Sequence, residues 1–449
     1  MAEAEVDMIS FLPLDIKLSI LSRLRIKHAV RTSALARSWR HLWTHLPCLR
    51  LNSEQDPLGD TYNTPNICNV HFVSSSWIQR VHRLVSSLQG PLSVFQLHFS
   101  GLCLFSSDES CVLVQSLLDL LLQKGGVKTL DLLFCNDPGK FHLPWFHSLR
   151  VLRLSKCYVA LPNRFQGFHR LETLSMNNVQ ISNDDLNLLL RTSNNLTTLL
   201  IYDCGVLGNL LSVNLSLPLL RHLEFTINEL VENLSVVSSP CLEHVEIKLI
   251  RKDYSSQNLA RMVLRLVTSV AMVSSLKLDF DVLKCFSLVA LPFNFTIPRL
   301  RFLMFYLDVD TMDRRVYDAF FWLLRSMPFL EELHVRLESN DEYDQADRAE
   351  ILMRELLVQK HDGFACLKRT VTSVTINMLT LDAITSIAWI QFFLLNAKEL
   401  KLLKIDYYFY CGHLMPSFIE ELQKAEVTSS DAKVMFFNRR THQITNVYE

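Results

Sequence analysis

A short hydrophobic frame, with apolar residues at the first, fourth and sixth of six positions, recurs along most of the chain. Successive clear copies start 22, 22, 25, 24 and 22 residues apart. One frame alone would match by chance about one time in eight in a chain that is 49% hydrophobic, so the regular spacing carries the inference. Each frame predicts a strand, and the spacing predicts a stack of similar units. The frame starts at Val127, Leu149, Leu171, Leu196, Leu220, Leu242, Val273, Leu300, Leu330, Val371 and Leu400, with an earlier copy at Leu92.

Apolar residues at helical spacing predict the segments that connect these strands. Helices are expected over Val73–Leu88 and over Cys111–Gln123, where the Gly125-Gly126 pair ends the second. Later frames stand 31, 27, 30 and 41 residues apart, which leaves room for further helices. These are expected over Asp313–Ser326 and Gln345–Val358, with a solvated acidic loop over Glu338–Glu350.

The N-terminal segment, residues 9–46, has more apolar side chains than a domain of its size can bury. Pro13 suits the first turn of a helix, and two adjacent apolar stripes follow it. The first stripe is Leu14, Leu18 and Leu21, and the second is Ile16, Ile20 and Leu24. Two more short helices are expected over Lys27–Ala36 and Arg37–His45. Because a domain of roughly 40 residues seldom folds stably alone, the segment predicts a protein partner. The alternative is an ordinary amphipathic cap on the rest of the chain.

This segment resembles the F-box. The motif's Leu-Pro pair, Ile-Leu pair and Trp are matched by Leu12-Pro13, Ile20-Leu21 and Trp39, and its plant-type ending by Thr32-Ser33, Leu35 and Trp39-Arg40-His41-Leu42-Trp43. Leu14, Arg25, Ala36 and Ser38 depart from the pattern but leave its apolar positions intact. The resemblance implies docking on a Skp-type adaptor of a cullin-based ubiquitin ligase. The implied contacts or supports are Leu12, Pro13, Ile16, Ile20, Leu21, Leu24, Val30, Leu35 and Trp39. Some of these are expected to be internal core, and the sequence leaves open which.

The repeated frame resembles the leucine-rich repeat. Cys135, Cys157 and Cys204 each stand eight positions after a frame start, where that repeat carries Cys or Asn. Leu122–Leu132 and Ile181–Leu186 are similar to the repeat region of plant F-box proteins. Near the C-terminus, Cys366-Leu-Lys and Ile390–Ile405 resemble the FBD region, although Thr380–Ser386 departs from its usual acidic start. In this interpretation, the helix Ile390–Leu400 and the strand after it seal the last open edge of the sheet.

These resemblances imply an α/β chain in which a three-helix F-box precedes a curved leucine-rich-repeat solenoid with a parallel sheet, capped by an FBD-like region. The expected domains are an F-box over 9–50, a linker and pre-repeat helix over 51–91, the solenoid over 92–365 and the FBD-like region over 366–440.

Composition and charge narrow the functional classes. The formal charge of −1 gives no general attraction to nucleic acid or anionic membranes, so neither partner is expected. The acidic N-terminus lacks the basic start of a secretory signal, and no long apolar run suggests a membrane span, so an intracellular protein of the nucleus or cytoplasm is expected. Eleven cysteines without a C-x-x-C pair indicate reduced thiols, with no metal site and no cofactor.

Residues between the buried frame positions are expected on the concave face of the solenoid, where a protein substrate would bind. The candidates are Arg153, Glu224, Glu246, Lys277 and His334, with Asp131, Ser175, Leu200, Met304, Thr375 and Lys404 on the same strands. Nucleotide, zincin and hydrolase motifs do not occur, and Glu243-His244 with Glu246 is disfavoured as a catalytic group. The family implies a non-catalytic substrate receptor of a Skp-cullin-F-box ubiquitin ligase. A non-ligase scaffold on the same solenoid is the alternative, and an enzyme on the repeats is disfavoured.

Overall fold

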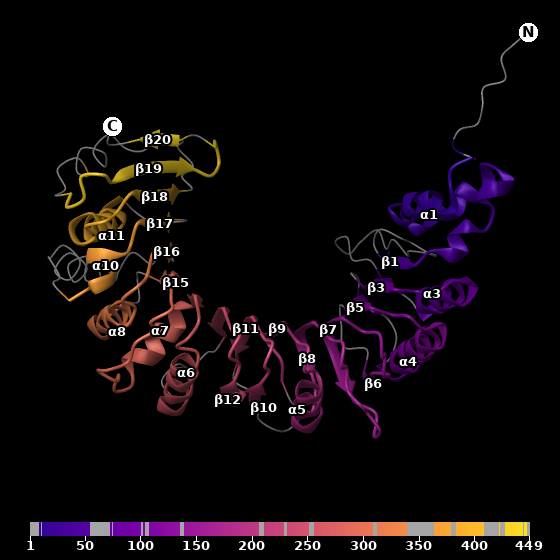
Figure 1. The fold of residues 1–449 in the computed structure, drawn as a ribbon. Helices are drawn as coiled ribbons and strands as arrows, with labels where there is room; N and C mark the ends of the chain where they lie inside the picture. Colours follow the sequence, from indigo (N-terminus) through magenta and orange to yellow (C-terminus); the bar gives the residue numbers. More distant parts are fainter. Residues whose placement is uncertain are drawn as a thin grey trace, which may run out of the picture. The chain divides into compact units, whose positions relative to one another are not determined.

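The computed structural model describes residues 9, 11–53, 72–73, 75–99, 102–103, 107–134, 139–205, 211–228, 231–250, 256–308, 312–338, 363–378, 383–407, 422, 427–442 and 444–446 (Figure 1). The expected helix Gln345–Val358, most of the acidic loop and Cys135 lie outside the described residues. The chain divides into two compact units, Met1–Leu220 and Arg221–Glu449.

In the first unit, the N-terminal helices lead directly into a parallel sheet. The helices are α1 (Leu14–Ser22) and α2 (Ile26–Arg31), followed by 3-10 turns η1 (Thr32–Ala34), η2 (Arg37–Trp39) and η3 (Leu42–His45). The sheet order is β1 (Cys48–Asn52), β3 (Val94–His98), β5 (Thr129–Leu133), β7 (Val151–Ala160), β8 (Thr173–Gln180) and β9 (Thr198–Tyr202), with β6 (Lys140–His142) beside β7. The return segments include α3 (Ser75–Ser87), α4 (Ser107–Lys124), α5 (Asn183–Thr192) and β10 (Leu211–Ser216), and β2 (Phe72–Val73) pairs with β4 (Leu102–Cys103).

The second unit continues the same plan with longer helices. Its sheet order is β11 (His222–Ile227), β13 (His244–Leu249), β14 (Ser275–Leu278), β15 (Phe302–Asp308), β16 (Glu332–Glu338), β17 (Ser373–Met378), β18 (Leu402–Tyr407) and β19 (Lys433–Asn438), all parallel, with β20 (Ile444–Asn446) antiparallel at the end. The return segments include β12 (Val231–Ser238), α6 (Gln257–Ser269), α7 (Phe280–Ser287), α8 (Arg314–Arg325), α10 (Ala365–Arg369) and α11 (Ala383–Asn396). Figure 1 shows the helices of each unit on one face of its strands, which leaves the other face open; we call it the open face.

Every predicted frame forms a strand, and the strand begins two residues after the frame start. The first frame residue is buried in each copy, and even the most accessible, Leu242, is only 7% exposed. These side chains point towards the helices, so neighbouring repeats within each unit share one continuous apolar core. In the second unit, rings of α8 and α11 fill that core, with Phe320 5.3 Å from Trp389 between ring centroids. The mixed α/β fold with a parallel repeat sheet is confirmed.

The predicted helices fare differently. Helices α3, α4 and α8 match their predictions, whereas α11 begins at Ala383, upstream of the predicted Ile390, and ends at Asn396, before the predicted Leu400. Gly125 and Gly126, with φ of 68° and 77°, end α4 in the left-handed conformation that glycine tolerates. The expected third N-terminal helix over Arg37–His45 is instead two 3-10 turns, because His41 between them has φ of 67° and interrupts the helical backbone.

The sheet is also longer at both ends than the repeat pattern indicated. It begins at β1, upstream of the expected solenoid start at residue 92, because Leu46, Leu49 and Leu51 form another frame that starts at the end of the segment that resembles an F-box. At the other end, β19 pairs with β18, so the strand after α11 is not the edge that the sequence interpretation assigned to it. Asp431 occupies the first position of the β19 frame, which is apolar in the predicted copies, so a search for the hydrophobic frame misses this strand.

Candidate functional site

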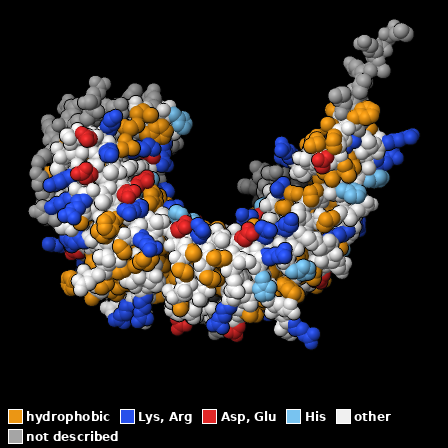
Figure 2. All heavy atoms as spheres, viewed as in Figure 1, with side chains coloured by type: hydrophobic (Ala, Val, Ile, Leu, Met, Phe, Trp, Pro, Cys, Tyr) orange, Lys and Arg blue, Asp and Glu red, His pale blue; other side chains and the backbone are white. Residues whose placement is uncertain are grey.

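The N-terminal segment exposes a line of large apolar side chains. They are Ile9, Phe11, Leu14, Ile16, Ile20, Leu24, Val30 and Leu35, each between 37% and 79% exposed, and we call them the apolar ridge. Figure 2 shows hydrophobic side chains gathered over this part of the chain. Soluble monomers expose single apolar residues commonly but rarely a contiguous set, so the ridge indicates a binding surface.

The structure separates the adaptor-binding residues named from the sequence into two groups. Leu21 and Trp39 are buried, at 0% and 3% exposure, and form the core of the segment. Ile16, Ile20, Leu24, Val30 and Leu35 belong to the ridge, while Pro13 is exposed and Leu12 half-buried beside it.

Lys17 completes this small core, and the sequence pattern gave no sign of it. Its side chain is buried, and its Nζ lies 5.6 Å from the centroid of the Trp39 ring. The aliphatic stem of a lysine can cover apolar surface while its ammonium group rests on an aromatic face. Lys17 and Leu21 of α1 are therefore buried, whereas Leu14, Ile16 and Ile20 of the same helix are exposed as part of the ridge.

The open face of the first unit aligns the predicted recognition residues across its strands. Asp131 pairs in register with Arg153, and Arg153 with Ser175, which in turn pairs with Leu200. Arg153 is exposed and makes no ion pair with another described residue. Asp131 contacts His98, with Oδ1 and Nε2 3.3 Å apart, and its hydrogen bond raises the pKa of that histidine.

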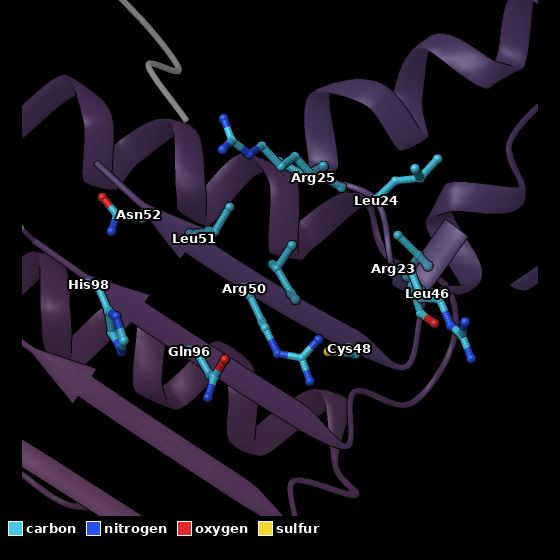
Figure 3. A pocket seen from close by; sticks show the side chains of 13 residues that line it. Arg23, Leu24, Arg25, Leu46, Cys48, Arg50, Leu51, Asn52, Gln96 and His98 are labelled. Carbon is cyan, nitrogen blue, oxygen red and sulfur yellow. The ribbon is translucent and has the colours of Figure 1, made fainter. Parts of the chain in front are cut away.

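A cavity of about 340 Å³ lies where the turn between α1 and α2 meets this open face. Figure 3 shows Arg50, Gln96 and His98 on the sheet side, with Leu24 and Arg25 opposite. The guanidinium groups of Arg23, Arg25 and Arg50 point in different directions in this view. They do not converge on one point, so the cavity lacks the geometry of a compact anion site.

In the second unit, the predicted residues form one register row along the open face. The row runs Glu224, Glu246, Lys277, Met304, His334, Thr375 and Lys404, and continues to Met435. The strand alternation that buries the frame positions turns these side chains to the open face.

Glu246 is the most buried acid of this row. Its carboxylate pairs with Lys248 on the same strand and with Lys277 Nζ on β14 at 3.3 Å, and we call these three residues the Glu246 cluster. Burial opposes the charge of Lys248, yet its hydrogen bond to Glu246 leaves the pKa of the amine raised. Lys248 is therefore positively charged near neutral pH.

A second cluster lies on the last parallel strands, and only Lys404 of it was predicted. Asp406 is buried and pairs with Lys404 Nζ at 2.9 Å and with Arg439 Nη2 at 3.2 Å; we call these three residues the Asp406 cluster. Arg439 also donates to Asn377 Oδ1 at 2.6 Å. The strand alternation after Leu400 could have placed Asp406 on the open face. Arg439 could not be found, because Asp431 hides the frame of β19.

Between these clusters the open face is aromatic and only weakly charged. His334 Nε2 lies 2.7 Å from Glu332 Oε1, and its ring packs edge-on against Phe302 at 4.8 Å between centroids. On β11, outside the stretch between the two clusters, His222 and Glu224 form a similar pair at 2.7 Å. Glu224 and His334 are thus each held by a neighbour on the same strand, which fixes their orientation.

The thiols of the repeats are poorly suited to nucleophilic chemistry. Burial raises the pKa of Cys204 to about 12 and that of Cys366 to about 11, and Cys157 is buried as well. A thioester-forming ligase needs a thiolate near neutral pH, which these side chains do not provide. No group of three His, Cys, Asp or Glu among the described residues could hold a metal ion. No helix in the described part of the chain has the length and apolarity to cross a bilayer.

Comparison with protein families matches both parts of the chain. The family model of the F-box domain covers residues 9–51, and the model described as "FBD-associated F-box protein At5g56370, LRR repeats" covers residues 114–335. The apolar ridge falls within the F-box match, and the frames from Val127 to Leu330 fall within the repeat match. The frames at Leu92, Val371 and Leu400 lie outside both matches.

Curated relatives from Arabidopsis thaliana agree with these matches. The F-box/FBD/LRR-repeat protein At1g13570 is 29% identical over 181 residues, which is 39% of each chain. The putative F-box/LRR-repeat protein At5g02700 is 28% identical over 178 residues, or 38% of each chain. The F-box protein At1g60400 is 44% identical over 52 residues, which cover 12% of this chain and 13% of that one. The matched segments span about two fifths of the length of the first two relatives. With an F-box at its N-terminus and leucine-rich repeats after it, this chain belongs to the plant F-box/leucine-rich-repeat/FBD protein family.

Proposed function

We propose that this chain is the substrate-receptor subunit of a Skp-cullin-F-box ubiquitin ligase. The F-box, residues 9–50, binds a Skp-type adaptor and through it a cullin, and the repeats hold a protein substrate. F-box/leucine-rich-repeat proteins are generally recognition subunits and not enzymes. In this role the chain accelerates ubiquitin transfer by bringing the substrate near the ubiquitin-conjugating enzyme, without chemistry of its own.

The apolar ridge is the observation that supports the proposal most. Burying one leucine or isoleucine side chain contributes about 1.5–3 kcal/mol, while association costs about 4–15 kcal/mol. The eight ridge side chains are about half exposed on average, so covering all of them contributes about 6–13 kcal/mol, which is of the same order as the association cost. Within the described F-box residues, Leu21 and Trp39 already fill the core, so the ridge is left for another subunit.

The open faces support the second half of the proposal. Their register rows carry Arg153 in one unit, and Glu224, Glu246, Lys277 and His334 in the other. We propose these residues as substrate contacts, on surfaces formed by the repeats of residues 92–365 and by the FBD-like strands of 366–440. Cytoplasm and nucleus are the proposed sites of action, because such ligases work there.

Adaptor binding tests the proposal directly. The chain would be produced with a recombinant plant Skp-type adaptor, and the affinity of the two purified proteins measured by calorimetry. We expect the Ile20→Asp, Leu35→Asp double variant to lose at least 100-fold in affinity, because both charges would be buried at the interface. Val237→Asp and Phe293→Asp provide a matched control, because these two side chains are also highly exposed but lie outside the F-box.

Two results would count against this role. Unchanged adaptor affinity in the double variant would show that the ridge is not the docking surface. Adaptor binding without recruitment of cullin to the complex would favour the scaffold over the ligase subunit.

A further inference from the structure

The open face of the second unit carries positive charge at two separated points. In the Glu246 cluster and in the Asp406 cluster, two cations surround one carboxylate, so each cluster has a net charge of +1. The two carboxylates are buried, whereas the side chains of the four cations are 37–44% exposed. A partner that approaches either cluster therefore meets its cations before its buried carboxylate.

Folding alone does not require these acids. Burying a carboxylate costs desolvation free energy that its ion pairs offset only in part. An uncharged residue at an equivalent place in the row, such as Thr375, avoids that cost. Each buried acid does hold two cations in place on an otherwise open sheet. Cations that are already ordered lose less entropy when they bind an anion, which is the benefit of preorganisation.

The two clusters belong to the same register row, so their separation follows from the sheet. Lys277 on β14 and Lys404 on β18 are four strand steps apart. At about 4.8 Å per step, their strands are about 19 Å apart. An extended peptide advances about 3.3 Å per residue, so about six residues bridge this distance.

The row between Lys277 and Lys404 presents Met304, His334 and Thr375. Phe302 and Tyr306 of β15 lie on either side of Met304 in the same strand. The acids nearest to this stretch are Glu332, which pairs with His334, and Asp308, at the end of β15. The middle of the row therefore suits uncharged side chains and offers aromatic surface for apolar ones.

We propose that the open face of the second unit binds an extended acidic segment of the substrate, which crosses the strands and places two anionic side chains about six residues apart on Lys277 and Lys404. The residues between the two anions are apolar or uncharged. This inference rests on the proposed function, since it names the kind of substrate that such a receptor selects.

Fluorescence anisotropy with short synthetic peptides tests the inference on the full chain in complex with its adaptor. The probe is a labelled nonapeptide with glutamates at positions 2 and 8 and uncharged residues between them. A second peptide has the glutamates three residues apart, a third has lysines in their place, and a fourth has phosphoserines at positions 2 and 8. We expect the first peptide to bind at least 10-fold more tightly than the second and third. The fourth shows whether carboxylate or phosphate is the preferred anion.

Variants identify where the peptide binds. Lys277→Ala and Lys404→Ala are each expected to weaken binding about 5-fold, and the double variant at least 20-fold. Arg265→Ala is the matched control, because it removes one exposed cation from α6, on the helical side, and it should change affinity less than 2-fold. Raising the salt concentration from 50 to 300 mM should weaken the wild type far more than the double variant, because salt screens exposed charges.

The outcomes separate this inference from the proposed function. Equal affinity for the two glutamate spacings, or a double variant that binds like the wild type, overturns the acidic-segment inference. The acidic-segment inference is also overturned if none of the four peptides binds to a complex that contains the adaptor. The receptor role would still stand in that case. Failure of the chain to bind the adaptor, whatever the peptides do, counts against the receptor role itself.

Discussion

The F-box and the repeats treat their apolar side chains in opposite ways. In the repeats, each predicted frame start is buried against neighbouring repeats, and the open face carries charged, polar and aromatic residues. In the F-box, only a small core around Leu21 and Trp39 is closed, and the apolar ridge faces outward. The repeats are thus completed by their own sequence neighbours, whereas the described residues of the F-box leave a large apolar surface uncovered.

Helix capping shows the same difference. Helices α5, α6, α7 and α8 of the repeats each have a Ser or Asp whose side chain accepts a hydrogen bond from the first turn. In the F-box, α1 and α2 follow Pro13 and Arg25, and neither side chain makes such a bond. The F-box helices therefore have less stability of their own, as expected of an element that is stabilised on binding.

The largest expected effect is in the aromatic core of the second unit. Phe320→Ala removes a buried ring that contacts Phe305 and Trp389, and should lower the free energy of unfolding by about 3–5 kcal/mol. Phe293→Ala makes the same change at a fully exposed ring and should alter it by less than about 0.5 kcal/mol. Urea unfolding measures both. A small effect of Phe320→Ala would contradict a core that the repeats complete alone.

Two adjacent residues sharpen the comparison within the F-box. Leu21→Ala removes a fully buried side chain and should cost about 2–5 kcal/mol in stability. Ile20→Ala removes a ridge side chain and should change the stability of the free chain by less than about 1 kcal/mol, but weaken adaptor binding. Thermal unfolding and calorimetric titration separate the two effects. Similar destabilisation by both substitutions would mean that the ridge serves the fold and not a partner.

The capping difference can be tested from both sides. Asp313 Oδ1 accepts from the backbone N–H of Val316 at 2.9 Å, so Asp313→Ala should cost about 1 kcal/mol, while Asp313→Ser should retain most of that stability. Conversely, Arg25→Asp supplies the missing cap to α2 and should stabilise the F-box by up to about 1 kcal/mol. Chemical unfolding followed by circular dichroism gives these values. No gain from Arg25→Asp would show that α2 is not limited by its cap.

The smallest expected effect depends on pH and lies where the F-box meets the sheet. The hydrogen bond to Asp131 raises the pKa of His98, so the pair stabilises the fold fully below the unfolded-state pKa of about 6.5 and loses that contribution as pH rises through the folded-state value. Because His98 is about one-third exposed, the loss should be only about 0.5 kcal/mol. Unfolding at pH 6 and pH 8.5 should show this difference in the wild type but not in Asp131→Asn.

Strand alternation made much of this structure predictable. Once the frame was recognised, its buried positions identified the strands, and the positions between them identified the open-face row from Glu224 to Lys404. Strand β1 was missed because its frame lies inside the F-box motif, and β19 because Asp431 is polar. In both cases the local sequence did not indicate a repeat strand, although the stacking of neighbouring strands places one there.

Partners across strands could not be predicted in the same way. Glu246 meets Lys277 and Asp406 meets Arg439 only because strands about 30 residues apart in sequence pair in one particular register. That register depends on the lengths of the intervening helices and loops, which the frame does not define. Likewise, the helical pattern of the F-box did not separate the buried Leu21 from the exposed Ile20, because the tertiary packing around Trp39 decides it.

The direct passage from the F-box into β1 has a mechanical consequence. Backbone hydrogen bonds from Gln89 to Thr44, at 2.7 Å, and from Ser93 to Pro47, at 2.8 Å, bind the end of the F-box to the segment before β3. β1 then joins β3 through the parallel ladder, which fixes the F-box helices relative to the first strands of the repeats. A substrate protein held on those strands would keep a fixed orientation relative to the adaptor. The substrate lysines that the ubiquitin donor can reach would then depend on the angle at which the substrate is bound.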